Sequence, residues 1–226
     1  MAKTNRAALL QPIFRIGDRM DYLTLKAAAD AEYTVNRSRF IAHASPVESA
    51  EEANVFIQEI RRQYPDATHN VFAFQVRQPE YARYSDDGEP SGTSGMPVLQ
   101  VLKGRGLTDS IIVVTRYFGG ILLGTGGLVR AYTQSAVLGV EAAGIVCMRQ
   151  CAAMVCPCPY AFYERFGRLL EKHGCVTEDT SFEADVRISF RIPSEQEAAF
   201  VKELAEISNG AVTVLKTAEK YDKFDV

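Results

Sequence analysis

The chain has 226 residues, of which 47% are hydrophobic and 23% charged, and its formal net charge is −3. This length suits one large domain or two modest ones, and the composition is ordinary for a globular protein. No apolar run approaches the roughly 18 residues of a membrane span, and residues 7–10 are too few for a signal-peptide core, so we expect a cytoplasmic protein with no membrane partner.

The charge distribution excludes a general nucleic-acid binder. Residues 1–146 contain 15 Lys and Arg against 15 Asp and Glu, and residues 147–226 contain 10 against 13. A protein that binds nucleic acid over a broad surface carries an excess of basic residues. Any RNA contact is therefore predicted to be a local patch.

The first part of the chain alternates between strand and helix periodicities. Residues 1–20 show no clear periodicity and are predicted to be an extension. Residues 22–35 and 39–47 are predicted to form an antiparallel pair of strands, and 48–64 has helical spacing with acids first and arginines last. Further along we expect a central strand over 69–77, a polar loop over 78–95, a short helix over 96–103, a strand over 111–115 and a long helix over 128–143.

The rest of the chain has the element order of a ferredoxin-like domain. Ser194 and Glu197 have the spacing of a capping box at the start of its second helix. The predicted elements are a strand over 152–157, a helix over 160–172, strands over 175–182 and 184–192, a helix over 195–208 and a strand over 211–215. This β-α-β-β-α-β order defines the class. The short linker near 145–150 predicts limited freedom between the two domains.

These patterns predict an α+β protein in three parts. Residues 1–20 form the extension, 21–146 the N-terminal domain and 147–226 the ferredoxin-like C-terminal domain.

The cysteines do not indicate a metal site. They are odd in number, which fits free thiols in a reducing compartment: Cys147, Cys151, Cys156, Cys158 and Cys175. Their spacing is not the two-residue spacing typical of zinc ligands. We therefore predict no metal and no cofactor, and we leave the role of the cluster open.

A dense glycine segment follows the strand predicted over 111–115. Five of the nine residues from 119 to 127 are glycine: Gly119, Gly120, Gly124, Gly126 and Gly127. This density is costly unless the backbone needs positive φ or close approach. Free amides at a helix start bind anions, and Arg116 and Arg130 flank the segment. Either a phosphate or carboxylate site, or tight strand–helix packing alone, explains the pattern.

The arginines and the aromatic residues of this segment each have two possible roles. The guanidinium groups of Arg116 and Arg130 match oxyanions, or they pair with the acidic residues of the 85–95 loop. Tyr117 and Phe118 could stack on a base, or they could belong to the core.

The polar loop offers further candidates with structural alternatives. Its acidic residues could bind magnesium or transfer protons, or they could stabilise a turn. A serine or threonine nucleophile needs a base within reach, and His69 is either that base or a structural histidine at the start of a strand. We predict no catalytic residue, and the predicted binding residues are His69, Asp86, Asp87, Glu89, Ser91, Thr93, Arg116, Tyr117, Gly119, Gly120, Gly124, Gly126, Gly127 and Arg130.

Three motifs together resemble the signature of the IMPACT/YigZ family. They are SDDGEPSGT at 85–93, TRYFGG at 115–120 and LGTGGLVRAY at 123–132, and residues 38–41 and 65–69 also resemble family positions. The resemblance covers roughly 20–145. Residues 147–226 resemble the companion domain of the bacterial YigZ branch, which is similar to the last domain of the translocation elongation factor.

The resemblance implies a fold and a link to translation. The N-terminal domain is expected to resemble the second domain of a small-subunit ribosomal protein. Eukaryotic relatives inhibit a kinase of a translation-initiation factor by competing for its activator, whereas bacterial members are suspected of binding nucleic acid or ribosomes. Residues 70–75 depart from the family pattern, which more often has Cys or Tyr and a basic residue there.

The predicted function is a non-enzymatic regulator associated with translation. It would bind the ribosome, RNA or a regulatory protein through the glycine and arginine segment, with a small anionic ligand as a further possibility. The alternative is a phosphotransferase or hydrolase acting on a phosphorylated small molecule at the glycine-rich loop. The loop lacks the Gly-Lys-Ser/Thr ending of a P-loop. Residues 187–190 only partly match an RNA-recognition signature, which favours a protein or ribosome partner.

Overall fold

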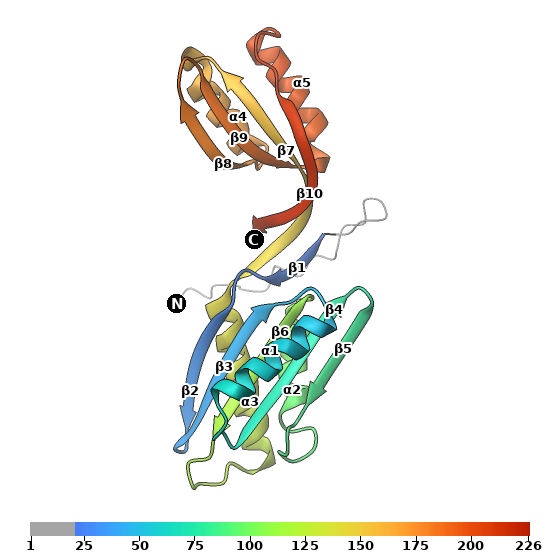
Figure 1. Ribbon diagram of the computed structural model, residues 1–226, viewed down its shortest axis with the longest axis vertical. Helices are drawn as coiled ribbons and strands as arrows, with labels where there is room; N and C mark the ends of the chain where they lie inside the picture. Colours follow the sequence, from blue (N-terminus) through green and yellow to red (C-terminus); the bar gives the residue numbers. More distant parts are fainter. Residues whose placement is uncertain (1–20) are drawn as a thin grey trace, which may run out of the picture. The chain divides into compact units, whose positions relative to one another are not determined.

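The structure is a computed structural model that describes residues 21–226, so the extension predicted over 1–20 lies outside the described residues. Residues 22–147 with 225–226 form one compact unit, the N-terminal unit, and 148–224 form a second, the C-terminal unit. Figure 1 shows helices and strands in both units. The predicted two-domain α+β class is confirmed.

The N-terminal unit is built on an antiparallel sheet. β6 (Ser110–Tyr117) lies at its centre and is buried over nearly its whole length. The strand order is β2 (Ala29–Val35), β3 (Ser38–Pro46), β6, β4 (His69–Arg77) and β5 (Glu80–Ser85). The predicted antiparallel pair is present as β2 and β3. A short strand, β1 (Tyr22–Leu25), contacts Leu107 through an isolated bridge at Leu23.

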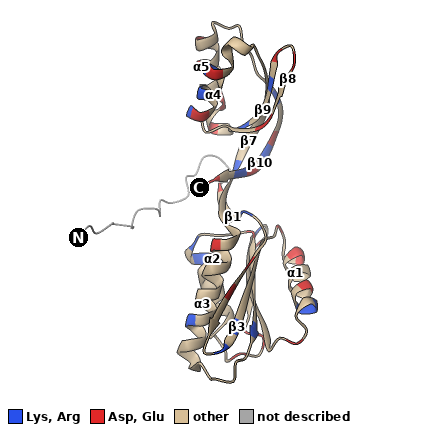
Figure 2. Ribbon diagram, turned by 90° about the vertical axis from the view of Figure 1, so that its left-hand side faces the viewer, with Lys and Arg blue, Asp and Glu red and all other residues tan. Residues whose placement is uncertain are grey.

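Helices cover both faces of this sheet, as Figure 2 shows. α1 (Ala50–Gln63) packs on one face against Ile111 and Val113. α2 (Gly95–Gly104) and α3 (Gly124–Ala143) pack on the other face. Because side chains alternate along a strand, the middle of β6 (111–114) is buried on both sides, and it is apolar at every one of these positions. This explains the continuous apolar run that marks the strand in the sequence.

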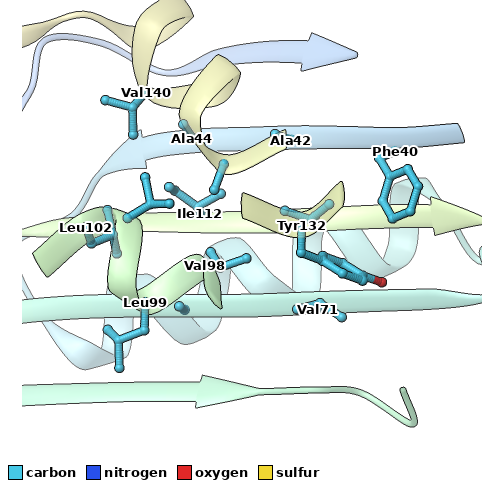
Figure 3. Close-up of a cluster of buried hydrophobic side chains, with 14 of the residues drawn as sticks. Phe40, Ala42, Ala44, Val71, Val98, Leu99, Leu102, Ile112, Tyr132 and Val140 are labelled. Carbon is cyan, nitrogen blue, oxygen red and sulfur yellow. The ribbon is translucent and has the colours of Figure 1, made fainter. Parts of the chain in front are cut away.

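The core beneath α2 and α3 reaches the end of the sheet at Tyr132. Figure 3 shows this side chain beside Phe40, and the two rings meet edge to face with centroids 5.2 Å apart. In the C-terminal part of α3, a Cβ added at Gly139 would lie 3.1 Å from the Cβ of Ala42. The helix therefore approaches β3 closely, which fixes the direction of its N-terminal end.

The C-terminal unit has the predicted βαββαβ order. β9 pairs antiparallel with β7 and β8, and β10 pairs with β7. Phe166, Phe190 and Phe200 form the centre of its core. The elements are β7 (Ile145–Cys158), the 3₁₀ turn η1 (Tyr160–Phe162), α4 (Tyr163–Lys172), β8 (Val176–Phe182), β9 (Val186–Pro193), the 3₁₀ turn η2 (Ser194–Gln196), α5 (Glu197–Ser208) and β10 (Leu215–Asp225).

Two predicted strand boundaries are wrong for the same reason. The segment 78–95, expected to be a loop, contains β5, and the last strand runs over 215–225 instead of 211–215. Most residues of both strands are exposed. A strand without a buried face has no apolar alternation, so the periodicity that reveals other strands is missing.

Three further boundaries differ. α3 begins at Gly124, four residues before the predicted start, so glycines expected in a turn form its first helical turn. The capping box predicted at Ser194 is absent because a 3₁₀ turn precedes α5, and its N-cap is Gln196. The expected linker near 145–150 lies within β7.

Among residues 21–226, no helix combines the length and the apolar composition that crossing a bilayer requires.

The N-cap of α1 allows a stability prediction. The Ser49 hydroxyl accepts a hydrogen bond from the Glu52 amide at 3.1 Å. We expect Ser49→Ala to lower the free energy of unfolding by about 1 kcal/mol, because a first-turn amide loses its partner. Urea unfolding followed by circular dichroism measures the change. Ser91→Ala, at an exposed position, is the control, and equal losses in both variants would contradict the assignment.

Candidate functional site

The predicted site residues gather at one end of the N-terminal sheet. On β6, Arg116 lies opposite Phe40 of β3 and His69 of β4. The loop that follows β5 and the first turns of α3 meet the same strand end, because Glu89 contacts both Arg116 and Tyr132. Segments far apart in the sequence thus form one polar cluster over the core.

A buried ion pair lies at the centre of the cluster. Glu89 Oε1 accepts hydrogen bonds from Arg116 Nη1 at 2.5 Å and from the Tyr132 hydroxyl at 2.8 Å. The side chains of Glu89 and Arg116 are 3% and 6% exposed, respectively. The structure therefore places Arg116 in the internal ion pair that the sequence left as an alternative. Its guanidinium also lies 5.3 Å from the ring centroid of Phe40 and 5.6 Å from that of Phe118.

The environment of Tyr132 disfavours loss of its proton. Burial and the neighbouring carboxylate of Glu89 raise the pKa of the Tyr132 phenol above its ordinary value. The neutral hydroxyl therefore acts as a permanent donor to Glu89. Tyr132 therefore joins the two regions: its hydroxyl belongs to the polar cluster and its ring packs in the apolar core.

His69 and Asp87 attach the polar loop to the sheet. His69 Nδ1 donates to the carbonyl oxygen of Asp87 at 2.8 Å, and its Nε2 lies 3.8 Å from Glu89 Oε1. The Asp87 carboxylate accepts from Arg61 Nη2 at 2.6 Å and from the Asn70 amide at 2.7 Å. The loop is thereby linked to α1 and β4.

Asp86 organises the start of α2. Its carboxylate accepts hydrogen bonds from the amides of Gly92 at 2.8 Å, Ser94 at 3.1 Å and Gly95 at 2.8 Å. A negative charge at this position also suits the positive end of the helix dipole. Nearby, the Thr93 hydroxyl donates to the Pro90 carbonyl oxygen at 2.7 Å, and Ser91 is exposed.

The glycines of the 119–127 segment serve different purposes. A Cβ at Gly119 would lie 2.0 Å from the carbonyl carbon of Arg37, so this position requires close backbone approach. Gly120 and Gly124 have φ of +82° and +68°, with open space where a Cβ would be. At Gly127 an added Cβ would be 3.0 Å from Leu123, whereas Gly126 is exposed near Arg130. Packing and backbone conformation thus account for most of the glycines.

An exposed surface remains above the cluster. Phe118, Ile121, Leu122 and Val129 are 45%, 42%, 85% and 38% exposed, and with Arg130 we call them the 118–130 surface. Within residues 21–226, the N-cap residue of α3, Leu123, makes no side-chain hydrogen bond to the helix, and Arg130 is exposed and forms no ion pair. Tyr117, just before this surface, is half-buried, and its hydroxyl donates to Asp66 at 2.9 Å.

An apolar hollow of about 340 Å³ adjoins this surface between α2 and α3. Val129 contributes to both. The hollow is lined by Gly92, Met96, Pro97, Gln100, Val101, Val129 and Thr133.

Some contacts of the site are not predicted from the sequence. Arg61 and Asn70 bind Asp87 from other elements, and Ser38 accepts a hydrogen bond from the Gly119 amide at 3.2 Å. No local motif marks these contacts, because they join segments distant in the chain. Ile121 and Leu122 did carry a signal, since two large apolar residues stand between glycines.

The cysteines form no ligand cluster. Among the described residues, no group of three or more His, Cys, Asp or Glu side chains is arranged to hold a metal ion. All five thiols are free, and burial raises the pKa of Cys156 to about 12.

Comparisons with protein families and known proteins give consistent matches. Residues 36–140 match the family described as Impact N-terminal domain, and 156–211 match Domain of unknown function (DUF1949). The chain is 37% identical over 190 residues to IMPACT family member YvyE of Bacillus subtilis (strain 168), covering 84% of this chain and 88% of the relative. It is 32% identical over 188 residues to IMPACT family member YigZ of Escherichia coli (strain K12), covering 82% and 92%.

Two further matches define the extent of the similarity. Protein IMPACT-A of Xenopus tropicalis is 34% identical over 98 residues, which are 40% of this chain and 30% of that protein. A solved structure described as the crystal structure of a hypothetical protein matches with a TM-score of 0.55 and 30% identity, covering 88% of this chain and 98% of the solved one.

The buried ion pair yields a double-mutant prediction. We expect Glu89→Ala to lower the free energy of unfolding by about 3–5 kcal/mol, because Arg116 is left buried without a counter-charge. Glu89→Leu with Arg116→Leu should cost less than the two single leucine substitutions added together. Urea unfolding measures all variants. Asp66→Ala, at an exposed acceptor, is the control, and strictly additive losses would refute the coupling.

Tyr132 should make stability fall at alkaline pH. Since its folded-state pKa lies above the ordinary value of 10.0, the unfolded chain loses the phenol proton first as pH rises. Its contribution is complete below about pH 10 and declines above it by up to about 1.4 kcal/mol per pH unit. Unfolding of Tyr132→Phe between about pH 9 and 11 should show a shallower decline. The exposed Tyr81→Phe serves as control, and an unchanged slope in Tyr132→Phe would contradict the prediction.

Proposed function

Because the chain belongs to the IMPACT family, we propose that it is a non-enzymatic regulator associated with translation that binds the ribosome through the 118–130 surface. The resemblance of its motifs to that family supports the link to translation. One observation carries the proposal: Leu122 is exposed beside Arg130 and beside the start of α3, which has no side-chain cap.

The chemistry of the surface suits a ribonucleoprotein. Arg130 offers a guanidinium to phosphate oxygens, and the first amides of α3 add donors at the positive end of the helix dipole. Phe118 supplies a ring that can stack on a base or pack on an apolar side chain. Leu122, which is 85% exposed, needs an apolar partner to lose its contact with water.

The internal bonds of the polar cluster favour binding over catalysis. A phosphotransferase would need carboxylates and a base that face its substrate. Here Asp86 binds amides of its own loop, Asp87 binds Arg61 and Asn70, and Glu89 binds Arg116. We infer that these residues position the surface above them and do not themselves contact the partner.

The charge balance supports a small contact area. With equal numbers of acidic and basic residues in 1–146, long-range attraction to RNA is weak, and affinity must come from few phosphate contacts together with apolar ones. Such binding depends on salt, but less steeply than that of a strongly basic protein.

Ribosome cosedimentation tests the proposal. We expect the protein to sediment with bacterial ribosomes at about 50 mM salt and to leave them at about 500 mM, because phosphate contacts release counterions. Arg130→Glu should weaken the association about tenfold or more, as expected from the loss of a charge-assisted contact. Leu122→Ser should weaken it through the apolar contact. Thermal melting of both variants should match the parent, since both side chains are exposed.

A matched control is available in the same unit. Arg62 is exposed on α1, which covers the other face of the sheet, so Arg62→Glu makes the same charge change away from the surface and should keep binding. Equal loss in Arg62→Glu and Arg130→Glu would contradict the assignment. A thermal shift caused by a nucleotide with magnesium and abolished by Arg130→Ala would instead support the phosphotransferase alternative.

A further inference from the structure

The C-terminal unit exposes a cluster of aromatic side chains that the proposed function does not use. Tyr160, Tyr163 and Phe182 are 54%, 37% and 59% exposed. The Phe182 ring centroid lies 6.5 Å from that of Tyr160 and 5.7 Å from that of Tyr163. We call these three residues the aromatic patch. Large apolar side chains that meet at the surface mark interaction sites more often than isolated ones do.

The patch is held in place by ordered structure. Tyr160 lies in η1 and Tyr163 in the first turn of α4, while Phe182 ends β8. The Tyr160 hydroxyl donates to the carbonyl oxygen of Glu183 at 2.8 Å, which connects the helix side to the β8–β9 turn. Ring positions fixed in this way reduce the entropy lost on binding.

Strand alternation places the patch on the helix-covered side of the sheet. Phe182 pairs with Val186, whose side chain is buried in the core beneath the helices. Ser181 pairs with Arg187 one position along. Since neighbouring residues of a strand point to opposite faces, Arg187 points away from the patch.

Three acidic residues lie next to members of the aromatic patch in the sequence. Glu164 follows Tyr163, and Glu183 and Asp185 lie in the turn after Phe182. All three are exposed and form no ion pair within residues 21–226. The nearby Arg165 lies over the ring of Phe162 at 5.6 Å. The unit as a whole is weakly acidic, with 10 Lys and Arg against 12 Asp and Glu in residues 148–224.

We propose that the aromatic patch is a docking surface for a lysine- or arginine-bearing segment of a partner protein. Cationic side chains are attracted to aromatic ring faces. The neighbouring carboxylates attract the same cationic side chains. Aromatic platforms for RNA bases combine rings with a positively charged groove. The neighbouring carboxylates would repel the phosphates of RNA and attract a basic peptide.

Fluorescence anisotropy with the full chain tests this proposal. The probe is a labelled synthetic peptide in which lysine alternates with glycine and serine, and its partner probe carries acetyl-lysine at the same positions. We expect binding of the lysine peptide only, because acetylation removes the charge. Phe182→Ala should weaken binding about fivefold, a typical loss for one cation–π contact. Val201→Ala, which truncates an exposed apolar residue of α5, should leave it unchanged.

A second pair of variants separates local from overall charge. Asp185→Asn and Glu206→Gln each remove one exposed carboxylate from the C-terminal unit, but only the first lies beside the aromatic patch. If Asp185→Asn weakens binding of the lysine peptide and Glu206→Gln does not, the result supports the docking surface. Equal weakening by both would overturn it, since the peptide would then respond to net charge only.

Other occupants would also overturn the proposal. If Phe182→Ala weakens binding of a single-stranded RNA probe but not of the lysine peptide, the patch binds nucleic acid. If the parent sediments as a dimer and Phe182→Ala as a monomer, the occupant is a second copy of the chain. Because all substituted side chains are exposed, unchanged thermal melting shows that each variant is folded.

Discussion

The buried contact between Glu89 and Arg116 is the constraint on which the N-terminal unit depends. Two charges taken out of water are stable only when each keeps a close partner. Glu89 meets this condition with Arg116 and Tyr132, which come from the central strand and from α3. The loop, the sheet and the helix must therefore be in their native positions at the same time. A binding surface built on these three segments therefore forms only when all three are in their native positions.

The sequence predicts the elements that have a buried face. The continuous apolar run of β6, the amphipathic α1 and the βαββαβ order of the C-terminal unit follow from periodicity alone. Periodicity does not reveal β5 and β10, because most of their residues are exposed. Periodicity also does not predict the start of α3 at Gly124, since glycine has poor helix propensity and only tertiary context places it in a helix.

The site was predictable as a set of residues but not as a set of contacts. The motifs identified the acidic loop, Arg116 and the glycines, and the family resemblance is confirmed. Which carboxylate meets which arginine depends on how distant segments approach one another. Asp87 binds Arg61, Asp86 binds amides, and only Glu89 meets Arg116. Charge and spacing alone could not distinguish these three acids.

The two arginines of the glycine segment show why burial decides a role. They are the same residue type 14 positions apart in one motif region, yet Arg116 is buried in an ion pair and Arg130 is exposed on the first turns of α3. An external phosphate would have to compete with the buried carboxylate of Glu89 for Arg116, whereas Arg130 is exposed and forms no ion pair among residues 21–226. Arg116 therefore fixes the geometry of the surface, and Arg130 is the residue through which that surface can meet a charged partner.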